Sequence, residues 1–240
     1  MPSHFYVSLE TTPEIGANLN LDSDQHHYLT RVLRLKSGDS LSCFDGAGLK
    51  FQASLQTERK AATLAVTEVH ARVASATPRN RIALAQLKGS AMDRAIQLAC
   101  ESGADEINLF KADRSNVSLS QERHEKKIRH WQKIIVGACE QSGRLFVPGF
   151  VPSSDLQSLL SSDASTYVLD MHGGPFNLMS NADRLLFVGP EGGWSDQELE
   201  QFKQARAQRV SVGPNTLRAE SAPGAALAIL GYLESLQKTS

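Results

Sequence analysis

The sequence predicts an α/β protein in which a small β-rich region precedes a layered domain with a mostly parallel sheet. Two observations support this class. Residues 4–69 contain short runs of alternating apolar and polar residues, a pattern typical of strands joined by turns. From residue 81 onward, short apolar runs alternate with longer segments of helical periodicity, and this order indicates a parallel sheet covered by helices.

The β-rich region contains four predicted strands and one predicted helix. Residues 39–44 and 49–55 alternate on either side of a DGAG turn signal, and we expect them to form a hairpin. Two further strands are expected over residues 4–9 and 62–69, and a short helix over residues 24–33. We interpret these elements as a small β-barrel, followed by a linker over residues 71–79.

Strand and helix signals alternate after the linker. Five strands are expected, over residues 81–87, 107–110, 167–171, 185–188 and 209–212. Four helices are expected: one from Ser90 to Gly103, one that includes residues 128–138 and ends at Gly143, one that starts at Ser195, and one over residues 219–236. Asp93 and Glu198 follow the two serines by three positions, which indicates capping boxes.

The composition excludes several classes of protein. Hydrophobic residues make up 41% and charged residues 21% of the 240 residues, as in ordinary globular proteins. Cys43, Cys100 and Cys139 form no CxxC pair, which argues against a disulfide framework and a zinc site. The N-terminal segment lacks the basic and apolar parts of a signal peptide, and no segment approaches the length of a membrane span. We therefore expect a cytoplasmic protein.

The net charge of −1 conceals an uneven distribution along the chain. Residues 79–150 contain 12 Lys and Arg against 8 Asp and Glu, whereas residues 151–240 contain 6 against 10. A basic surface in the middle of the chain can bind phosphate groups even when the whole protein is nearly neutral. An ordinary solvated helix face explains the same charges equally well.

Three glycine-rich loops follow predicted strands in the second half of the chain: MHGGP at 171–175, GPEGG at 189–193 and GPNTLRAE at 213–220. A tight connection would explain any one of them. Three at successive strand ends favour a ligand site, because ligands of α/β sheets bind beyond the carboxyl ends of the strands. The GxGxxG, P-loop, GxSxG and HExxH motifs are absent, so the corresponding nucleotide-binding and hydrolytic functions have no support.

Blocks over nearly the whole chain resemble the RsmE family of the SPOUT superfamily, whose members methylate N3 of a uridine in small-subunit ribosomal RNA. The blocks are HHYLTRVLRLKSGD (26–39), KGSAMDRAIQLACESGA (88–104), DRSNV (113–117), RHWQKIIVGACEQSGR (129–144), FVGPEGG (187–193) and VGPNTLRAESA (212–222). GPEGG followed by the LRAESA turn is the most specific combination. The chain departs from the family pattern at ACESGA and at Ala219 and Ser221, where threonines are common.

The resemblance implies a PUA-like RNA-binding β-barrel over residues 1–72, a linker over 73–79, and a SPOUT methyltransferase domain with a C-terminal trefoil knot over 80–240. It implies S-adenosyl-L-methionine as the cofactor and a homodimer that acts on 16S rRNA or the 30S ribosomal subunit, without a metal or a membrane. The cofactor-binding residues implied are Met171, Gly189, Glu191, Gly192, Gly193, Val212, Leu217, Arg218 and Ala222.

Arg218 is the first candidate for a catalytic residue. N3 of uracil carries a proton, so methylation there requires a base or a group that stabilises the anion. An arginine can pair with a cofactor carboxylate or with a uracil carbonyl; alternatively it forms a salt bridge to Glu191 or Glu220 that fixes its own loop. Glu191 and Glu220 are the acids of these loops and the candidate bases, although Glu220 is also explained as an acid in the first turn of a helix.

Basic residues in both regions are candidates for RNA docking through phosphate contacts. They are Arg31, Arg34, Lys36, Lys88, Arg94, Arg114 and Arg144. Two other functions stay open. One is a SPOUT methyltransferase that acts on another RNA position, such as a ribose 2′-hydroxyl or a transfer RNA base, because a fold alone does not determine the target. The other is a non-catalytic RNA-binding ribosome assembly factor.

Overall fold

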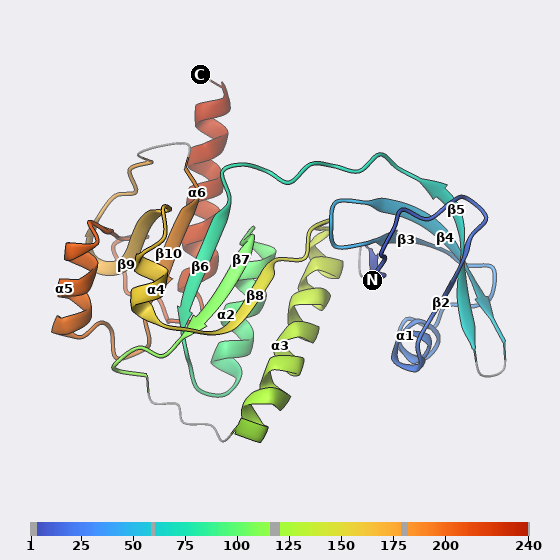
Figure 1. The fold of residues 1–240 in the computed structure, drawn as a ribbon, viewed down its shortest axis with the longest axis horizontal. Coiled ribbons are helices and arrows are strands. Elements are labelled where there is room, and N and C mark those ends of the chain that lie inside the picture. The colour runs from blue at the N-terminus through green and yellow to red at the C-terminus, as the bar shows by residue number, and fades with distance from the viewer. Residues whose placement is uncertain (1–3, 59–60, 116–120, 179–181, 240) are drawn as a thin grey trace. The chain divides into compact units, whose positions relative to one another are not determined.

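A computed structural model describes residues 4–58, 61–115, 121–178 and 182–239. The chain divides into two compact units (Figure 1). The first comprises residues 1–75 together with 139–147, and the second comprises residues 76–138 and 148–240. The domains predicted from the sequence were two continuous segments, 1–72 and 80–240. This prediction did not anticipate that residues 139–147 belong with the first unit.

The first unit is built on a five-stranded sheet. In spatial order its strands are β1 (Phe5–Tyr6), β3 (Ser40–Phe44), β4 (Lys50–Thr57), β5 (Ala62–Val69) and β2 (Asn18–Asn20). The predicted hairpin is confirmed, because β3 and β4 pair antiparallel from Ser40–Ser54 to Phe44–Lys50. β1 and β2 are the two edges of this sheet, so in the described part of the chain the strands form an open sheet and not a hydrogen-bonded closed barrel.

Alternation along β4 and β5 builds the core of the first unit. Phe51, Ala53 and Leu55 of β4 are buried, and so are Leu64 and Val66 of β5. Successive side chains of a strand point to opposite faces, so these residues share one side of the sheet. Burying each of the larger ones contributes about 1.5–3 kcal/mol.

The predicted helix over residues 24–33 is a short α-helix continued by a π-helical turn. α1 (Ser23–His27) starts at a capping box, in which the Asp22 side chain accepts from the Gln25 backbone N–H and the Gln25 side chain accepts from that of Asp22. The π-helix η1 (Tyr28–Val32) buries Leu29 completely. The helix ends as Arg34 enters the left-handed region with φ of 59°.

The second unit contains a six-stranded sheet, and among the described residues each pair of neighbouring strands in it is parallel. A mostly parallel sheet was predicted. In spatial order the strands are β11 (Gln208–Val210), β9 (Ser165–Gly174), β10 (Arg184–Val188), β6 (Asn80–Ala85), β7 (Glu106–Phe110) and β8 (Gly149–Ser154). All residues of the central strand β10 are buried, as expected for a strand covered on both faces.

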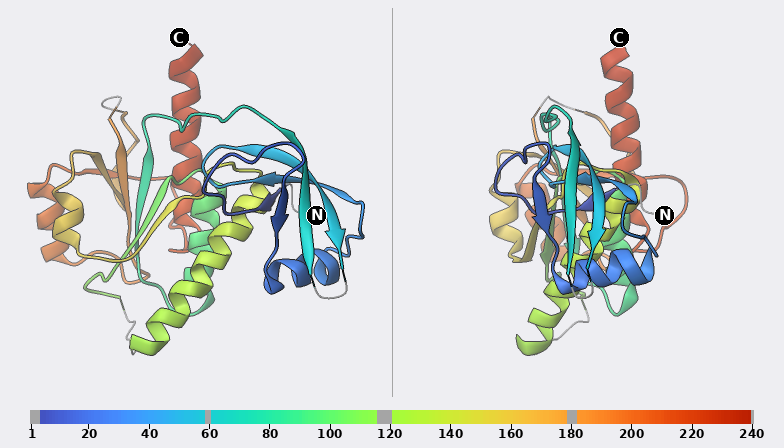
Figure 2. Two further views of the ribbon diagram at one scale, coloured as in Figure 1. Left: turned by 45° about the vertical axis from the view of Figure 1, so that its right-hand side comes forward. Right: turned by 90° about the vertical axis from the view of Figure 1, so that its right-hand side faces the viewer.

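Helices cover both faces of this sheet (Figures 1 and 2). They are α2 (Ser90–Glu101), α3 (Gln121–Ser142), α4 (Leu156–Leu160), α5 (Asp196–Gln204) and α6 (Ala222–Thr239). Leu159 of α4 and Phe202 of α5 share one apolar cluster with Leu185 and Phe187 of β10, whereas α6 packs against α2 on the other side. None of these helices, within the described residues, is long and apolar enough to cross a bilayer.

One predicted helix cap is wrong and one is confirmed. Gly89, with φ of 59°, occupies the N-cap of α2, and no side chain caps that helix. Asp93 instead accepts from Nε1 of Trp131 at 3.0 Å and lies 2.9 Å from Nε2 of His130, so its carboxylate joins α2 to α3. Ser195 and Glu198 form the predicted capping box of α5.

Candidate functional site

A cavity of about 490 Å³ lies where β9, β10 and β11 end. Its size is in the range of small-molecule sites. It is lined by Arg114, Leu169, Asp170, Met171, His172, Val188, Gly189, Pro190, Glu191, Gly192, Gly193, Trp194, Leu199, Arg209, Val210, Ser211, Val212, Asn215, Thr216, Leu217, Ala219 and Ala222. The three glycine-rich loops predicted from the sequence all contribute to this wall.

Close packing shapes the GPEGG loop after β10. A Cβ atom added to Gly189 would lie 3.1 Å from the Trp194 ring, and one added to Gly192 would lie 3.1 Å from Cβ of Arg114. Gly193 has φ of 67° and donates its N–H to the Pro190 carbonyl at 3.0 Å. Glycine is therefore suited to this turn both by backbone conformation and by the space available.

Trp194 joins this loop to the end of β9. Trp194 as a whole is 8% exposed, and its ring packs against Phe110 and Phe202. Its Nε1–H donates to the Leu169 carbonyl at 2.9 Å. A buried indole that finds a hydrogen-bond acceptor is rigidly oriented, so Trp194 fixes the distance between two walls of the cavity.

Glu198 holds the loop after β7 beside the start of α5. The residue is 3% exposed, and its carboxylate accepts from the backbone N–H of Asp113 at 3.0 Å and from that of Ser195 at 2.8 Å. Next to it, Nη1 of Arg114 donates to the Gly192 carbonyl at 3.0 Å. Through these contacts the loop after β7 is held in place beside the GPEGG loop.

The structure brings most of the predicted cofactor-binding residues together. Those that line the cavity are Met171, Gly189, Glu191, Gly192, Gly193, Val212, Leu217 and Ala222. Arg218 is not among the described residues that line it. Its side chain is 86% exposed, and Nη1 lies 3.8 Å from Oε1 of Glu220. An exposed ion pair of this kind contributes about 0–1 kcal/mol to stability, so it holds Arg218 only weakly.

The candidate bases differ in their positions. Glu191 is exposed and lines the cavity. Glu220 is partly buried, lies just before α6 and pairs with Arg218. The structure therefore brings Arg218 together with Glu220, which is the ion pair that the sequence offered as an alternative to a catalytic role.

The seven RNA-docking candidates are distributed over both units. Those in the first unit are Arg31, Arg34, Lys36 and Arg144, and those in the second are Lys88, Arg94 and Arg114. All are exposed except Arg144, which is partly buried. Arg114 lines the cavity and is held by Gly192, so its backbone contact competes with a role in binding phosphate.

Sequence reasoning missed several residues of the wall, above all Trp194, Asp170 and Arg209. The position of Trp194 directly after GPEGG could have indicated it. Asp170 and Arg209 form an ion pair 39 positions apart in sequence, for which no local pattern exists. Among the described residues, no group of three His, Cys, Asp or Glu side chains lies close enough to hold a metal ion.

Two known families match this chain, one in each of its two regions. Residues 75–231 match a family described as an RNA methyltransferase domain, and residues 21–67 match one described as an RNA methyltransferase PUA domain. These matches confirm the N-terminal PUA-type domain that the resemblance implied, and they agree with the α/β class that the alternation of strands and helices predicted.

Curated relatives align over nearly the full length. A Synechocystis protein named ribosomal RNA small subunit methyltransferase E is 31% identical over 238 residues, which cover 94% of this chain and 77% of that protein. A Bacillus subtilis protein of the same name is 27% identical over 257 residues, which cover 98% of each.

Several solved structures share the fold, and two of them contain the cofactor. That of ribosomal RNA small subunit methyltransferase E from Neisseria gonorrhoeae, bound to S-adenosyl methionine, has a TM-score of 0.84 and 29% identity, and the match covers 97% of this chain and 98% of that one. A Legionella pneumophila structure in complex with the same cofactor has a TM-score of 0.88 and 28% identity, with the same coverage.

Proposed function

This chain belongs to the RNA methyltransferase family, and we propose that it transfers a methyl group from S-adenosyl-L-methionine to N3 of a uridine in 16S ribosomal RNA. The observation that carries the proposal is the cavity at the ends of β9, β10 and β11. It lies within the segment that matches the methyltransferase domain, and the relatives named for small-subunit RNA methylation align across it.

The cavity fits S-adenosylmethionine in size and in chemistry. Its volume of about 490 Å³ suits a ligand of this class. A Cβ added to Gly193 would meet nothing within 4 Å, so that part of the backbone is open to a ligand. Apolar surface for an adenine ring comes from four side chains of the wall: Leu169, Met171, Val188 and Leu217. When bound, the cofactor supplies a methyl group made electrophilic by its sulfonium.

The chain must then orient the uracil and manage the N3 proton. We assign Arg218 to the uracil carbonyl or the cofactor carboxylate, since its guanidinium is exposed and only weakly paired. A positive charge there stabilises the anion that develops as N3 loses its proton. Glu191, on the cavity wall, and Glu220, beside Arg218, are the proposed proton acceptors.

We assign the first unit to RNA docking. It includes the match to the PUA domain and three exposed cations, Arg31, Arg34 and Lys36. The substrate is naked 16S rRNA or the assembled 30S subunit, and since either is found in the cytoplasm the protein would act there. Lys88, Arg94 and Arg114 of the second unit and Arg144 of the first are further proposed contacts.

A trefoil knot and a homodimer belong to the same proposal. β11 is an edge strand beyond β9, yet α6, which follows it, packs against α2 and β6. The segment between them therefore runs from the edge of the sheet back to its centre, a path that both a knotted and an ordinary connection can take. On α6, Tyr232 is 63% and Leu236 48% exposed. Apolar side chains in such positions favour contact with a second copy, and light scattering of the purified protein would test it.

The reaction is tested by incubating the protein with labelled S-adenosylmethionine and 30S subunits from a strain that lacks it. Mass spectrometry of the product nucleosides should find the label in 3-methyluridine. Label in another nucleoside would support the alternative of a methyltransferase with a different RNA target. Absence of both transfer and cofactor binding would overturn the proposal in favour of a non-catalytic assembly factor.

A further inference from the structure

The end of β9 leaves the ladder that it forms with β11. Arg209 pairs with Val168, whereas the next residue of β11, Val210, pairs with Gly174. Residues 169–173 are therefore an insertion in β9 that has no counterpart in β11, in the manner of an enlarged β-bulge. A Cβ on Gly173 would lie 2.5 Å from the Val210 nitrogen, so glycine permits the close approach with which the bulge rejoins the sheet.

The bulge forms one wall of the cofactor cavity. Leu169, Asp170, Met171 and His172 all line it. Met171 is 63% exposed, and its sulfur lies 3.8 Å from Oγ1 of Thr216 in the loop opposite. The shape of the cavity therefore depends on how these residues are held.

Asp170 is a residue of the bulge, and its carboxylate makes the hydrogen bonds that hold the bulge in place. Its Oδ1 accepts the His172 backbone N–H at 2.8 Å, which closes a local turn. Its Oδ2 accepts Nε of Arg209 at 3.0 Å and Nη2 at 2.6 Å. The Asp170 side chain is 10% exposed, and charge-assisted bonds to a carboxylate withdrawn from water are among the stronger polar contacts.

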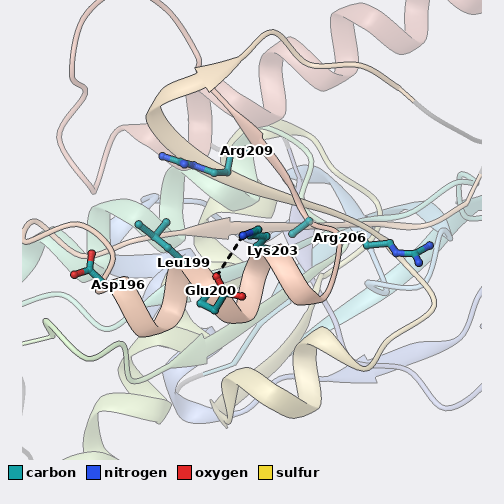
Figure 3. Close-up of a pocket in the computed structure, with 7 residues that line it drawn as sticks. Asp196, Leu199, Glu200, Lys203, Arg206 and Arg209 are labelled. Atoms are coloured by element: carbon teal, nitrogen blue, oxygen red, sulfur yellow. Dashed lines mark ion pairs between the residues drawn. The ribbon is translucent and has the colours of Figure 1, made fainter.

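Arg209, the partner of Asp170 in this ion pair, lies on β11. Its side chain lines the cofactor cavity and also a second cavity of about 460 Å³ beside α5. Figure 3 shows this second cavity, with Arg209 on its strand and the Lys203–Glu200 ion pair on α5. Arg209 thus faces both cavities, whereas its partner Asp170 lines the cofactor cavity.

We propose that Asp170 and Arg209 are positioning residues, which hold the 169–173 bulge in the conformation that binds S-adenosylmethionine. The inference rests on the proposed function, in which the cavity takes this cofactor. Without the pair the bulge would populate other conformations, and the apparent affinity would fall by the fraction that stays competent. A decrease of about tenfold corresponds to one molecule in ten remaining competent.

The test is a calorimetric titration of S-adenosylmethionine into the wild type, Asp170→Asn, Asp170→Ala, Arg209→Gln and the Asp170→Asn/Arg209→Gln double variant. Asn keeps an acceptor for the His172 N–H but loses the ion pair, so Asp170→Asn should bind about tenfold more weakly and Asp170→Ala more weakly still. The double variant should lose no more than the worse of its two single changes, because both break one interaction. Arg206→Ala removes a neighbouring arginine that lines only the second cavity, and it should bind like the wild type.

Hydrogen exchange of the free proteins separates positioning from a purely structural role. The amides of residues 169–173 should exchange faster in Asp170→Asn and Arg209→Gln, whereas β10 and β6 should stay protected. A wild type that fails to bind S-adenosylmethionine would overturn the proposed function and this inference together. A wild type that binds, beside folded Asp170 and Arg209 variants with dissociation constants within twofold of it, would overturn the positioning role alone.

Discussion

Arg218 has an exposed side chain and one distant ionic partner, so its removal should test chemistry without disturbing the fold. We predict that Arg218→Ala lowers turnover by about 10²–10³-fold, the usual cost of removing a group that stabilises developing negative charge. The free energy of unfolding should change by no more than about 0.5 kcal/mol. Turnover and thermal unfolding measured on the same preparation check both statements.

Arg206→Ala is the matched control for this experiment. Like Arg218, Arg206 is an exposed arginine of the second unit, but its neighbours Ala205 and Ala207 do not line the cofactor cavity, whereas Leu217 and Ala219 beside Arg218 do. It should retain wild-type turnover. Full activity in a folded Arg218→Ala protein would leave Arg218 with only its ion pair to Glu220.

Glu140 should make the stability of the first unit depend on pH. Burial raises the pKa of its carboxyl above the ordinary value of 4.5, against the opposing effect of hydrogen bonds from the Tyr6 N–H and Tyr28. The folded state therefore binds this proton more tightly than the unfolded state does. The stability that follows is fully present below the ordinary pKa and is lost as the pH rises through the raised one.

Glu140→Gln imitates the protonated form and keeps an acceptor for the Tyr6 N–H. We predict that the variant gains stability relative to the wild type as the pH rises from 4 toward 8, measured by urea unfolding at each pH. Exposed Glu10→Gln controls for the loss of one charge. A difference between Glu140→Gln and the wild type that shrinks with rising pH would contradict this account.

At the level of secondary structure, α6 is anchored to the sheet by a buried charge. Arg184 begins β10 with a side chain 2% exposed, and its Nη1 donates to Glu234 of α6 and, at 3.2 Å, to Oδ1 of Asn80. Removing one partner of a buried pair leaves the other charge uncompensated, so Glu234→Ala should cost about 3–5 kcal/mol. Urea unfolding measures this cost.

The Lys203–Glu200 ion pair on α5 is a control, because it joins the same kinds of charged group at the exposed surface of the protein. These side chains are 80% and 56% exposed and 3.7 Å apart, so Glu200→Ala should cost less than about 1 kcal/mol. Equal costs for the two alanine substitutions would mean that the Arg184–Glu234 pair does not anchor α6.

Secondary structure could be predicted where the periodicity was strong. The limits of β5 agree with the predicted residues 62–69, and the β3–β4 hairpin forms around its turn signal. Other elements have weak local signals. β8 contains Pro152, which disfavours a central strand, and it is an edge strand in the structure. β2 has one apolar residue, Leu19, between two asparagines.

The candidate site was predictable only in part, for a related reason. The GPEGG loop could be predicted because its turn and its close packing require glycines, and glycines are visible in the local sequence. The pair of Asp170 with Arg209 and the contact of Trp194 with Leu169 depend on strand pairing between distant segments. The cap of α2 was wrong because Asp93 is used by Trp131 of another helix.

For the whole molecule, we propose that the first unit contributes RNA affinity and that the cavity of the second unit determines cofactor affinity. Replacing Arg31, Arg34 and Lys36 together with alanine should weaken RNA binding. The slope of log affinity against log salt should become shallower by about 0.7–0.9 for each phosphate that the variant no longer neutralises. The dissociation constant for S-adenosylmethionine should stay unchanged, because none of the three lines the cavity. Filter binding over a range of salt concentrations, beside calorimetry of the cofactor, checks both parts.

A matched surface change is Lys203→Ala with Arg206→Ala, which removes two exposed cations outside the proposed docking set. It should leave the salt dependence as in the wild type. An unchanged affinity and slope in the triple variant would remove the first unit from the docking surface.

Hydrogen exchange of the wild type with and without S-adenosylmethionine tests whether this cavity is the cofactor site of the enzyme. The proposed function predicts slower exchange in the three segments that contain most of the residues lining the cavity: 169–173, 189–194 and 210–219. The β-sheet of the first unit should be unaffected. Cofactor-dependent protection confined to residues outside these segments, or no protection at saturating cofactor, would contradict the assignment of the cavity.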